Sequence, residues 1–255
     1  MSIEGLGVDR AAGVLRLTFD RPDRLNSLSP AIIHATADAI DAAASGGTRV
    51  IVLTGAGRAF SSGADVGADG APPGLDTLDA ANRLALTIAA SPIVVIAAVN
   101  GIAAGVGCSI ALAADLAIAK HSAAFMLAFT KIGLMPDGGA SLLVAASIGR
   151  ARALRMALLA EKVPAATAFE WGLIAGVVSD DDFEAEVDRI AEQVASGPPL
   201  ALGATKKAIN GASVDLLDAT LRAERAGQAP LLESADFREG MAAFQAKRRA
   251  EFSGA

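Results

Sequence analysis

The chain has 255 residues, of which 53% are hydrophobic and 20% charged, and its formal net charge is −6. This length and composition are typical of a protein with one large buried core, and they exclude a disordered chain. The acidic balance excludes a broad attraction to nucleic acid, so any anionic ligand has to be held by local positive groups.

No feature of the sequence indicates a membrane, secreted or metal-binding protein. The most apolar stretch, residues 93–116, is interrupted by Asn100 and by glycines, whereas a membrane-spanning helix needs about 20 consecutive apolar residues. The N-terminus lacks the basic and apolar regions of a secretory signal. Cys108 is the only cysteine and is interpreted as a small buried apolar residue, and His34 and His121 stand apart from other metal ligands. We therefore expect a cytoplasmic protein without a metal.

The first half of the chain alternates between strand and helix patterns. Residues 13–19 alternate apolar and polar side chains, as a half-buried strand does, and residues 93–99 form a continuous apolar run that predicts a strand buried on both faces. Ser29 followed by Pro30 predicts the start of a helix. The expected elements are, in order, a strand at 13–19, a helix from Pro30, a strand at 49–54, a long loop at 55–73, a helix at about 78–90, a strand at 93–99, a helix after 100–107 and a strand at 116–119. This order predicts an α/β fold with parallel strands.

From Ala140 onward the sequence predicts mainly helices, with one short strand at 173–178. The break Gly197-Pro198-Pro199 predicts a boundary between a core domain, residues 1–197, and a helical region, residues 198–255. Two apolar stripes in that region are formed by Val214, Leu217 and Leu221 and by Phe237, Met241 and Phe244. Such stripes need a surface to pack on, which is either the main domain or a neighbouring subunit.

Two glycine-bearing loops follow predicted strands. These loops are Ser62-Gly63-Ala64-Asp65 and Ala104-Gly105-Val106-Gly107. Ligands in open α/β sheets bind outside the carboxyl ends of the strands, and glycine lets the backbone approach a ligand closely. Two such turns side by side can direct two backbone N–H groups at one oxygen, which is an oxyanion hole. The same glycines are also typical of loops that only turn the chain.

Four segments together resemble the crotonase superfamily, the enoyl-CoA hydratases and isomerases. These segments are Arg21–Leu28, Leu53–Asp65, Ala97–Gly101 and Ala235–Phe244. The match runs in order along nearly the whole chain. The resemblance implies an α/β fold in which ββα units form a spiral, followed by a C-terminal helical trimerisation region, and a homotrimer or a dimer of trimers. It also implies an acyl-CoA substrate, so coenzyme A enters as part of the substrate and no separate cofactor is expected.

The resemblance also implies the roles of individual residues. By family position, the thioester oxygen is held by the backbone N–H groups of Ala64 and Val106, where valine crowds the pocket more than the glycine often found in the family. The CoA phosphates call for cations, for which Arg24, Arg58 and Lys247 are candidates; Lys247 belongs to the C-terminal region and can come from the same or from another subunit. Each of these is also interpretable as an ordinary exposed charge. The other implied substrate-binding positions are Leu25, Ser62, Asp65, Val66, Gly105 and Phe129. For Asp65, the residue pattern favours a role in holding its own loop.

Two positions depart from the hydratases of this family. The two glutamates with which those enzymes activate water fall here on Ser109 and Phe129. Neither residue can act as a carboxylate base, although adding water to a double bond needs one proton taken from water and another delivered to carbon. The departure therefore argues against an ordinary hydratase.

Asp137 is the remaining carboxylate candidate. Its position before the predicted helix 140–148 favours a helix N-cap on pattern alone. However, the segment Ala128–Asp137 resembles the isomerase branch linked to phenylacetate degradation, in which an aspartate here is a catalytic acid/base. One carboxylate can move a proton between two carbons while the oxyanion hole holds the enolate, and a dry pocket would raise its pKa towards neutrality. We therefore expect an enoyl-CoA isomerase. Two alternatives stay open, namely a hydratase with atypical water activation and a non-catalytic acyl-CoA binding protein.

Overall fold

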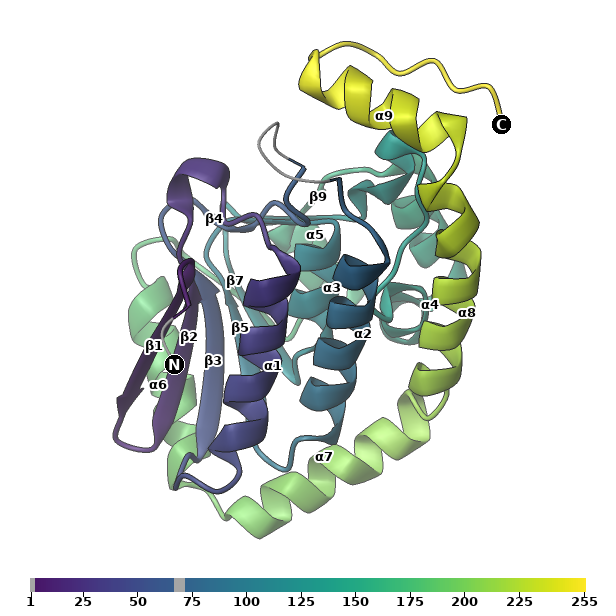
Figure 1. Ribbon diagram of the computed structural model, residues 1–255. Coiled ribbons are helices and arrows are strands. Elements are labelled where there is room, and N and C mark those ends of the chain that lie inside the picture. Colours follow the sequence, from purple (N-terminus) through teal and green to yellow (C-terminus); the bar gives the residue numbers. More distant parts are fainter. Residues whose placement is uncertain (1–2, 67–71) are drawn as a thin grey trace.

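The computed structural model describes residues 3–66 and 72–255, and their strands form two sheets (Figure 1). The larger, six-stranded sheet has the order β1-β2-β3-β5-β7-β10. Its first pair is antiparallel and all its other neighbours are parallel. The strands are β1 (Leu6–Ala11), β2 (Val14–Phe19), β3 (Val50–Gly55), β5 (Val94–Val99), β7 (Leu116–Lys120) and β10 (Gly176–Val178).

The smaller sheet has the order β4-β6-β8-β9, parallel except for its last pair. Its strands are β4 (Ala59–Ser61), β6 (Ile102–Ala104), β8 (Ala124–Met126) and β9 (Val163–Pro164). Three successive units, β3-β4-α2, β5-β6-α3 and β7-β8-α4, each place one strand in the large sheet, the next in the small sheet, and then a helix. This repeat is the spiral of ββα units that the resemblance implied, so the predicted α/β fold class is confirmed. Trimerisation through the C-terminal helices stays a prediction.

Helices surround the two sheets. The α-helices are α1 (Pro30–Ala43), α2 (Leu75–Ala90), α3 (Val106–Ala113), α4 (Ala140–Leu159), α5 (Ala165–Trp171), α6 (Phe183–Ser196), α7 (Pro199–Ser213), α8 (Leu217–Leu232) and α9 (Ala235–Gln245). Two 3-10 helices are η1 (Pro22–Arg24) and η2 (Ala128–Ile132). As predicted, α1 begins at Pro30, and the Ser29 side chain accepts a hydrogen bond from the Ile32 N–H. No helix of the described residues is both long and apolar enough to cross a membrane.

The predicted elements differ from the structure mainly in the small sheet. The segment 55–73, predicted as a loop, contains β4, and β6 lies within the predicted turn 100–107. Strands of three residues are too short to show an alternating pattern, and their pairing is decided by contacts distant in the sequence. The strand predicted at 173–178 is confined to its last three residues, and the antiparallel β1 was not predicted.

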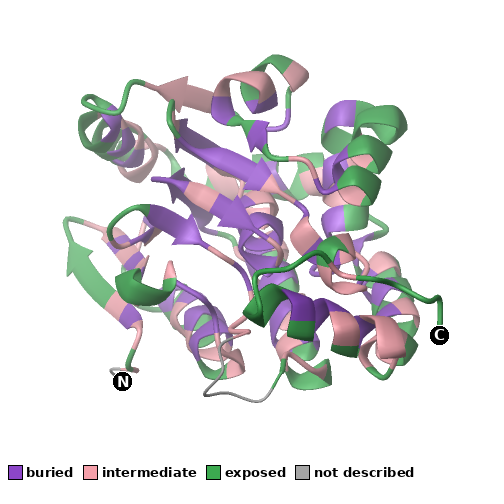
Figure 2. Ribbon diagram, turned by 90° about the horizontal axis from the view of Figure 1, so that it is seen from above, coloured by how far each residue is buried: buried purple, intermediate pink, exposed green. Residues whose placement is uncertain are grey.

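The inner strands of the large sheet are buried on both faces, whereas the edge strand β1 is mostly exposed. Along β5, Val95, Ala97 and Val99 belong to the main core, whereas Val94, Ile96 and Ala98 join the cluster formed with α6. The continuous apolar run therefore is a strand buried on both faces, as predicted. Figure 2 shows the strands mostly buried and the outer helix faces exposed.

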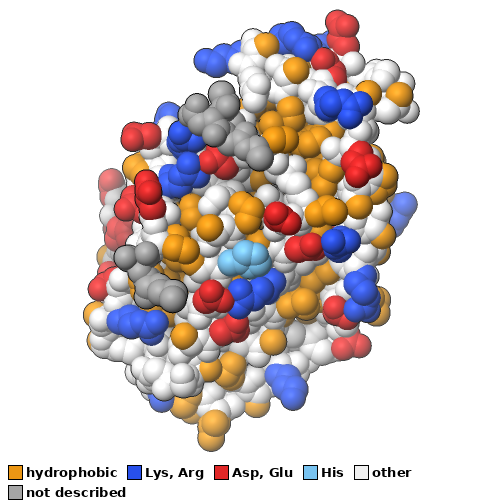
Figure 3. All heavy atoms as spheres, in the orientation of Figure 1, with side chains coloured by type: hydrophobic (Ala, Val, Ile, Leu, Met, Phe, Trp, Pro, Cys, Tyr) orange, Lys and Arg blue, Asp and Glu red, His pale blue; other side chains and the backbone are white. Residues whose placement is uncertain are grey.

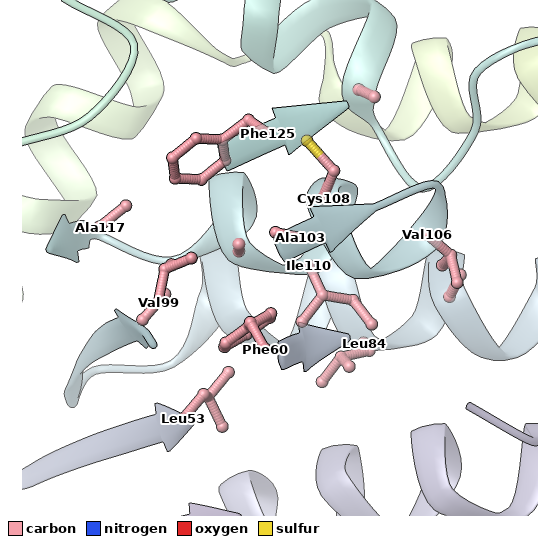
Figure 4. Close-up of a cluster of buried hydrophobic side chains, with 14 of the residues drawn as sticks. Leu53, Phe60, Leu84, Val99, Ala103, Val106, Cys108, Ile110, Ala117 and Phe125 are labelled. Carbon is pink, nitrogen blue, oxygen red and sulfur yellow. The ribbon is translucent and has the colours of Figure 1, made fainter. Parts of the chain in front are cut away.

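Cys108 lies in the main core, where Figure 4 shows it near Phe125 and Ala103. Burial raises the pKa of its thiol to about 12, so the group stays protonated at neutral pH. The prediction of a small buried apolar residue is confirmed.

The C-terminal helices wrap around the body, with α7 below, α8 along the side and α9 across the top in Figure 1. Leu217 and Leu221 of the first predicted stripe are buried, and α8 contacts both α2 and α4. This stripe therefore packs on the main domain of the same chain. Lys206 fixes α7, because its ammonium donates to the Ile88 and Ile93 carbonyls and pairs with Asp115 at 2.8 Å. A domain boundary at residue 197 stays a prediction, although α6 and α7 do separate there.

Candidate active site

The two glycine-bearing loops lie side by side, directly after the paired strands β4 and β6. Gly63 has a φ of +99°, and a Cβ atom at this position would lie 2.8 Å from the Ala104 carbonyl oxygen. Only glycine allows both this backbone conformation and this close approach. The contact between the loops thus depends on the glycines that the sequence pattern singled out.

Ala64 and Val106 each keep a backbone N–H that donates to no acceptor among the described residues. In the β-bridge between Leu28 and Ala64, the Leu28 N–H donates to the Gly63 carbonyl (2.8 Å) and the Asp65 N–H donates to the Leu28 carbonyl (3.0 Å). The Ala64 N–H takes no part in this bridge. Val106 is the first residue of α3, and N–H groups in a first helical turn have no partner within the helix. Both residues line one cavity, and two unpaired N–H groups beside one cavity are what an oxyanion hole requires.

Two buried asparagines hold the turn that leads into β4. The Asn26 amide donates to the Ala59 carbonyl at 2.7 Å, and the Asn100 amide donates to the same carbonyl at 3.2 Å. The Asn100 side-chain oxygen also accepts from the Gly55 N–H at 3.2 Å. Both asparagines belong to segments that carry the family resemblance. Their physical role is to fix the backbone of residues 55–59, which precedes β4 and the loop that carries Ala64.

A cavity of about 420 Å³ opens beside the two loops, and its lining is mostly apolar. The predicted site residues that line it are Leu25, Ser62, Ala64, Val66, Gly105, Val106, Phe129 and Asp137. Helix α9 overhangs this region, and Figure 3 shows hydrophobic side chains gathered beneath it. Phe244 of α9 is 58% exposed and also lines the cavity, so the second predicted stripe is only partly buried.

Four predicted substrate-binding residues do not line this cavity, namely Arg24, Arg58, Asp65 and Lys247. Asp65 lies beside it and pairs with Arg21 at 2.7 Å and with Arg24 at 3.8 Å, so it links its loop to η1. Lys247 lies on the exposed segment after α9. Contacts of Arg24, Arg58 and Lys247 with CoA phosphates stay predictions. Lys131, which was not predicted, is a cation that does line the cavity.

Asp137 is a buried carboxyl group in the cavity wall, with only 7% of the residue exposed. Burial raises its pKa to about 7; the hydrogen bond from Gln228 opposes this shift and the charge of Glu224 adds to it. Its Oδ2 accepts from the Gln228 amide at 3.0 Å, whereas Oδ1 has no partner among the described residues. The carboxyl group is therefore able to take up and release a proton near neutral pH.

The interpretation of Asp137 as a helix cap is wrong. Helix α4 begins at Ala140 after Gly139, and no side chain of its own caps it. Instead, Glu224 of α8 accepts from the Gly139 N–H (2.8 Å) and from the Ser141 N–H (3.0 Å), and also from the Ser141 hydroxyl. A residue distant in the sequence thus accepts hydrogen bonds from the N–H groups at the start of the helix. The Asp137 side chain does not cap the helix and lines the cavity instead.

Comparison with known proteins decides the family. The model of the enoyl-CoA hydratase/isomerase family matches residues 9–255. The chain belongs to this family. A probable enoyl-CoA hydratase of Rhodobacter capsulatus is 46% identical across the whole of both chains. The 1,2-epoxyphenylacetyl-CoA isomerase of Escherichia coli K12 is 40% identical over 95% of each chain.

A solved structure supports the same family. The crystal structure of an enoyl-CoA hydratase from Mycobacterium avium subsp. paratuberculosis K-10 superimposes with a TM-score of 0.94 at 50% identity, covering 99% of this chain and 100% of that one. The resemblance to the crotonase superfamily, including its phenylacetate isomerase branch, is confirmed. The protein is therefore an acyl-CoA enzyme of the enoyl-CoA hydratase/isomerase family, whose relatives carry the names of both reactions.

Ser109 and Phe129, which replace the two glutamates of the family's hydratases, lie in different surroundings in this structure. Ser109 is fully buried, donates to the Gly105 carbonyl at 3.4 Å and does not line the cavity. Phe129 lines the cavity as an apolar wall. Among the described residues that line the cavity, Asp137 is thus the one with a carboxyl group.

Glu224 and Gln228 are site residues that the sequence reasoning missed. The buried residues of α8 are Leu217, Leu221, Glu224 and Gln228, a spacing of four, three and four that places them on one helix face. Two polar side chains that continue an apolar stripe are a signal of buried polar contacts. The sequence therefore contained an indication of these residues, but not of the loop that they contact.

Proposed function

We propose that this protein is an enoyl-CoA isomerase that moves a double bond within an unsaturated acyl-CoA. One observation carries the proposal: a single buried carboxyl group, Asp137, stands in the described lining of an apolar cavity that Ala64 and Val106 also line. The similarity to an enzyme named as an isomerase supports it.

The proposed reaction needs one base and one oxyanion site. The thioester oxygen of a 3-enoyl-CoA accepts hydrogen bonds from the N–H groups of Ala64 and Val106. The Asp137 carboxylate removes a proton from the α carbon, and the electron pair moves onto the thioester oxygen to give a dienolate. The protonated Asp137 then returns the proton to the γ carbon, which yields the 2-enoyl-CoA and restores the carboxylate.

The cavity suits this chemistry in two ways. A pKa of about 7 means that Asp137 exists in both protonation states near neutral pH, so it can both accept and return the proton. Phe129 occupies the position of a glutamate that hydratases use, which leaves an apolar wall where a second carboxylate would hold the attacking water.

The test is Asp137→Asn assayed with a 3-enoyl-CoA, because asparagine keeps the size of the side chain but cannot act as a base. We expect turnover to fall by about 10²- to 10⁴-fold. Asp79→Asn is the control, since Asp79 pairs with Arg225 on the surface. Unchanged turnover of Asp137→Asn contradicts the proposal.

The wild-type protein separates the two alternatives. Hydration of crotonyl-CoA at an enzymatic rate, without isomerisation, would indicate a hydratase. Tight binding of acyl-CoAs with no turnover of any of them would indicate a binding protein that lacks catalysis.

A further inference from the structure

Helix α8 of the C-terminal region reaches back to the loop that carries Asp137. Gln228, which is 1% exposed, contacts that loop three times. Its side-chain oxygen accepts from the Met135 N–H at 3.0 Å, and its amide nitrogen donates to the Met135 carbonyl at 3.0 Å. The same nitrogen donates to Oδ2 of Asp137 at 3.0 Å.

The contacts with Met135 fix the orientation of the Gln228 amide. A backbone N–H can only donate and a carbonyl can only accept, so the side-chain oxygen has to face the N–H of Met135 and the nitrogen its carbonyl. An amide turned the other way would lose both hydrogen bonds. The group that faces Asp137 is therefore an N–H donor, which stabilises the charged form of the carboxylate.

We propose that Gln228 is a positioning residue for Asp137: it holds Oδ2 and leaves Oδ1 as the oxygen that takes and returns the substrate proton. The inference rests on the proposed isomerisation, in which Asp137 is the acid/base. It assigns to the C-terminal region a part in the active site in addition to its packing role.

Glu224 supports the same loop from one helical turn earlier. It binds the N–H groups of Gly139 and Ser141, while Gln228 binds Met135, so the two side chains of α8 hold the loop on both sides of Asp137. Their electrical effects are opposite, since a donor favours ionised Asp137 and a nearby negative charge disfavours it.

Lys131 of η2 is the other ionisable residue among the described residues that line this cavity. Arg225 lies between Glu224 and Gln228 in the sequence of α8, but its guanidinium pairs with Asp79 at 2.7 Å on the surface. A substitution of Arg225 therefore changes the same helix without touching the loop of Asp137.

The experiment compares Gln228→Met, Glu224→Gln and Arg225→Gln with the wild type. The pKa of Asp137 is measured by NMR on protein with ¹³C-labelled aspartate, and the pH dependence of kcat is measured with a 3-enoyl-CoA. Gln228→Met removes the donor and should raise both the NMR pKa and the acid limb of kcat by roughly one to two pH units. Glu224→Gln should move both downwards, and Arg225→Gln should leave both unchanged.

A merely structural role of Gln228 would lower kcat equally at all pH values and leave the Asp137 titration unmoved, and that result in folded Gln228→Met overturns the inference. If Gln228→Met does not fold, an NMR titration of the wild type still tests whether Gln228 contacts Asp137. Its Gln228 side-chain ¹⁵N resonance should move with the titration of Asp137 and stay constant in Asp137→Asn. A resonance that is constant in both proteins overturns the inference.

Failure of the proposed function remains distinguishable from failure of this inference. The NMR titrations report on the contact between Gln228 and Asp137 whether or not the enzyme turns over. Absence of isomerase activity in the wild type, with coupled titrations of these two residues, would contradict the reaction and leave the contact established.

Discussion

Asp137→Asn should stabilise the folded protein at alkaline pH while it strongly lowers turnover. Burial raises the pKa of Asp137 to about 7, whereas an aspartate in an unfolded chain has a pKa of about 3.9. Between these values the unfolded chain has released its proton and the folded protein still holds it. The unfolded state therefore binds fewer protons, so this group lowers the free energy of unfolding as pH rises from about 4 to about 7.

The magnitude follows from the size of the pKa shift. A shift of about three units, at about 1.4 kcal/mol per unit, corresponds to roughly 4 kcal/mol of stability that ionisation removes above pH 7. Asparagine carries no ionisable group and can accept the same hydrogen bond from Gln228, so it escapes this loss. We expect Asp137→Asn to exceed the wild type by up to roughly 4 kcal/mol at about pH 8, with much of this advantage lost at about pH 4.

Urea unfolding of both proteins at these two pH values measures the difference, with Asp79→Asn as the control. Asp79 is half exposed at the surface, so its variant should show no comparable gain at high pH. A stability difference between Asp137→Asn and the wild type that is equal at both pH values would refute a raised pKa for Asp137.

The remaining predictions concern activity and the packing of the C-terminal region. Turnover by the wild type should fall about tenfold per unit below roughly pH 7 as Asp137 takes up a proton, and initial rates that stay flat down to pH 5 would speak against it. Gly63→Ala should lower kcat by about 10²- to 10³-fold with a smaller effect on KM, because its φ of +99° and the crowding at its α carbon displace an oxyanion donor. Gly211→Ala, with open space around its α carbon in α7, is the matched control and should keep its kcat. Lys206→Met should lower the free energy of unfolding by about 3–5 kcal/mol, since it removes the ion-pair partner of the largely buried Asp115 carboxylate; wild-type stability in urea would contradict this.

The sequence predicted the parts of the site that depend on local backbone chemistry. Glycines that follow apolar strands indicated the two loops, and the structure places Gly63 against the carbonyl of Ala104. Strands β3 and β5 of the large sheet were found because their residues are buried in continuous runs, and β2 because its residues alternate, whereas the largely exposed β1 was missed. The three-residue strand β4 could not be found, because its neighbours in the small sheet come from later in the chain.

The surroundings of Asp137 were beyond prediction for a similar reason. The resemblance pointed to the residue itself, but its burial and its hydrogen bond depend on a helix about ninety positions later in the sequence. The residue pattern alone favoured a helix cap, because Asp137 closely precedes α4. The cap is supplied by Glu224, and only the folded chain brings that side chain to the start of α4.

The central claim is that one carboxyl group moves a proton within the substrate without adding water. Mass spectrometry of the reaction of a 3-enoyl-CoA in ¹⁸O-labelled water tests it most directly. We predict a 2-enoyl-CoA without ¹⁸O, formed by the wild type and not at a comparable rate by Asp137→Asn. A hydroxyacyl-CoA that carries ¹⁸O as the main product, or equal formation of the 2-enoyl-CoA by both proteins, would contradict it.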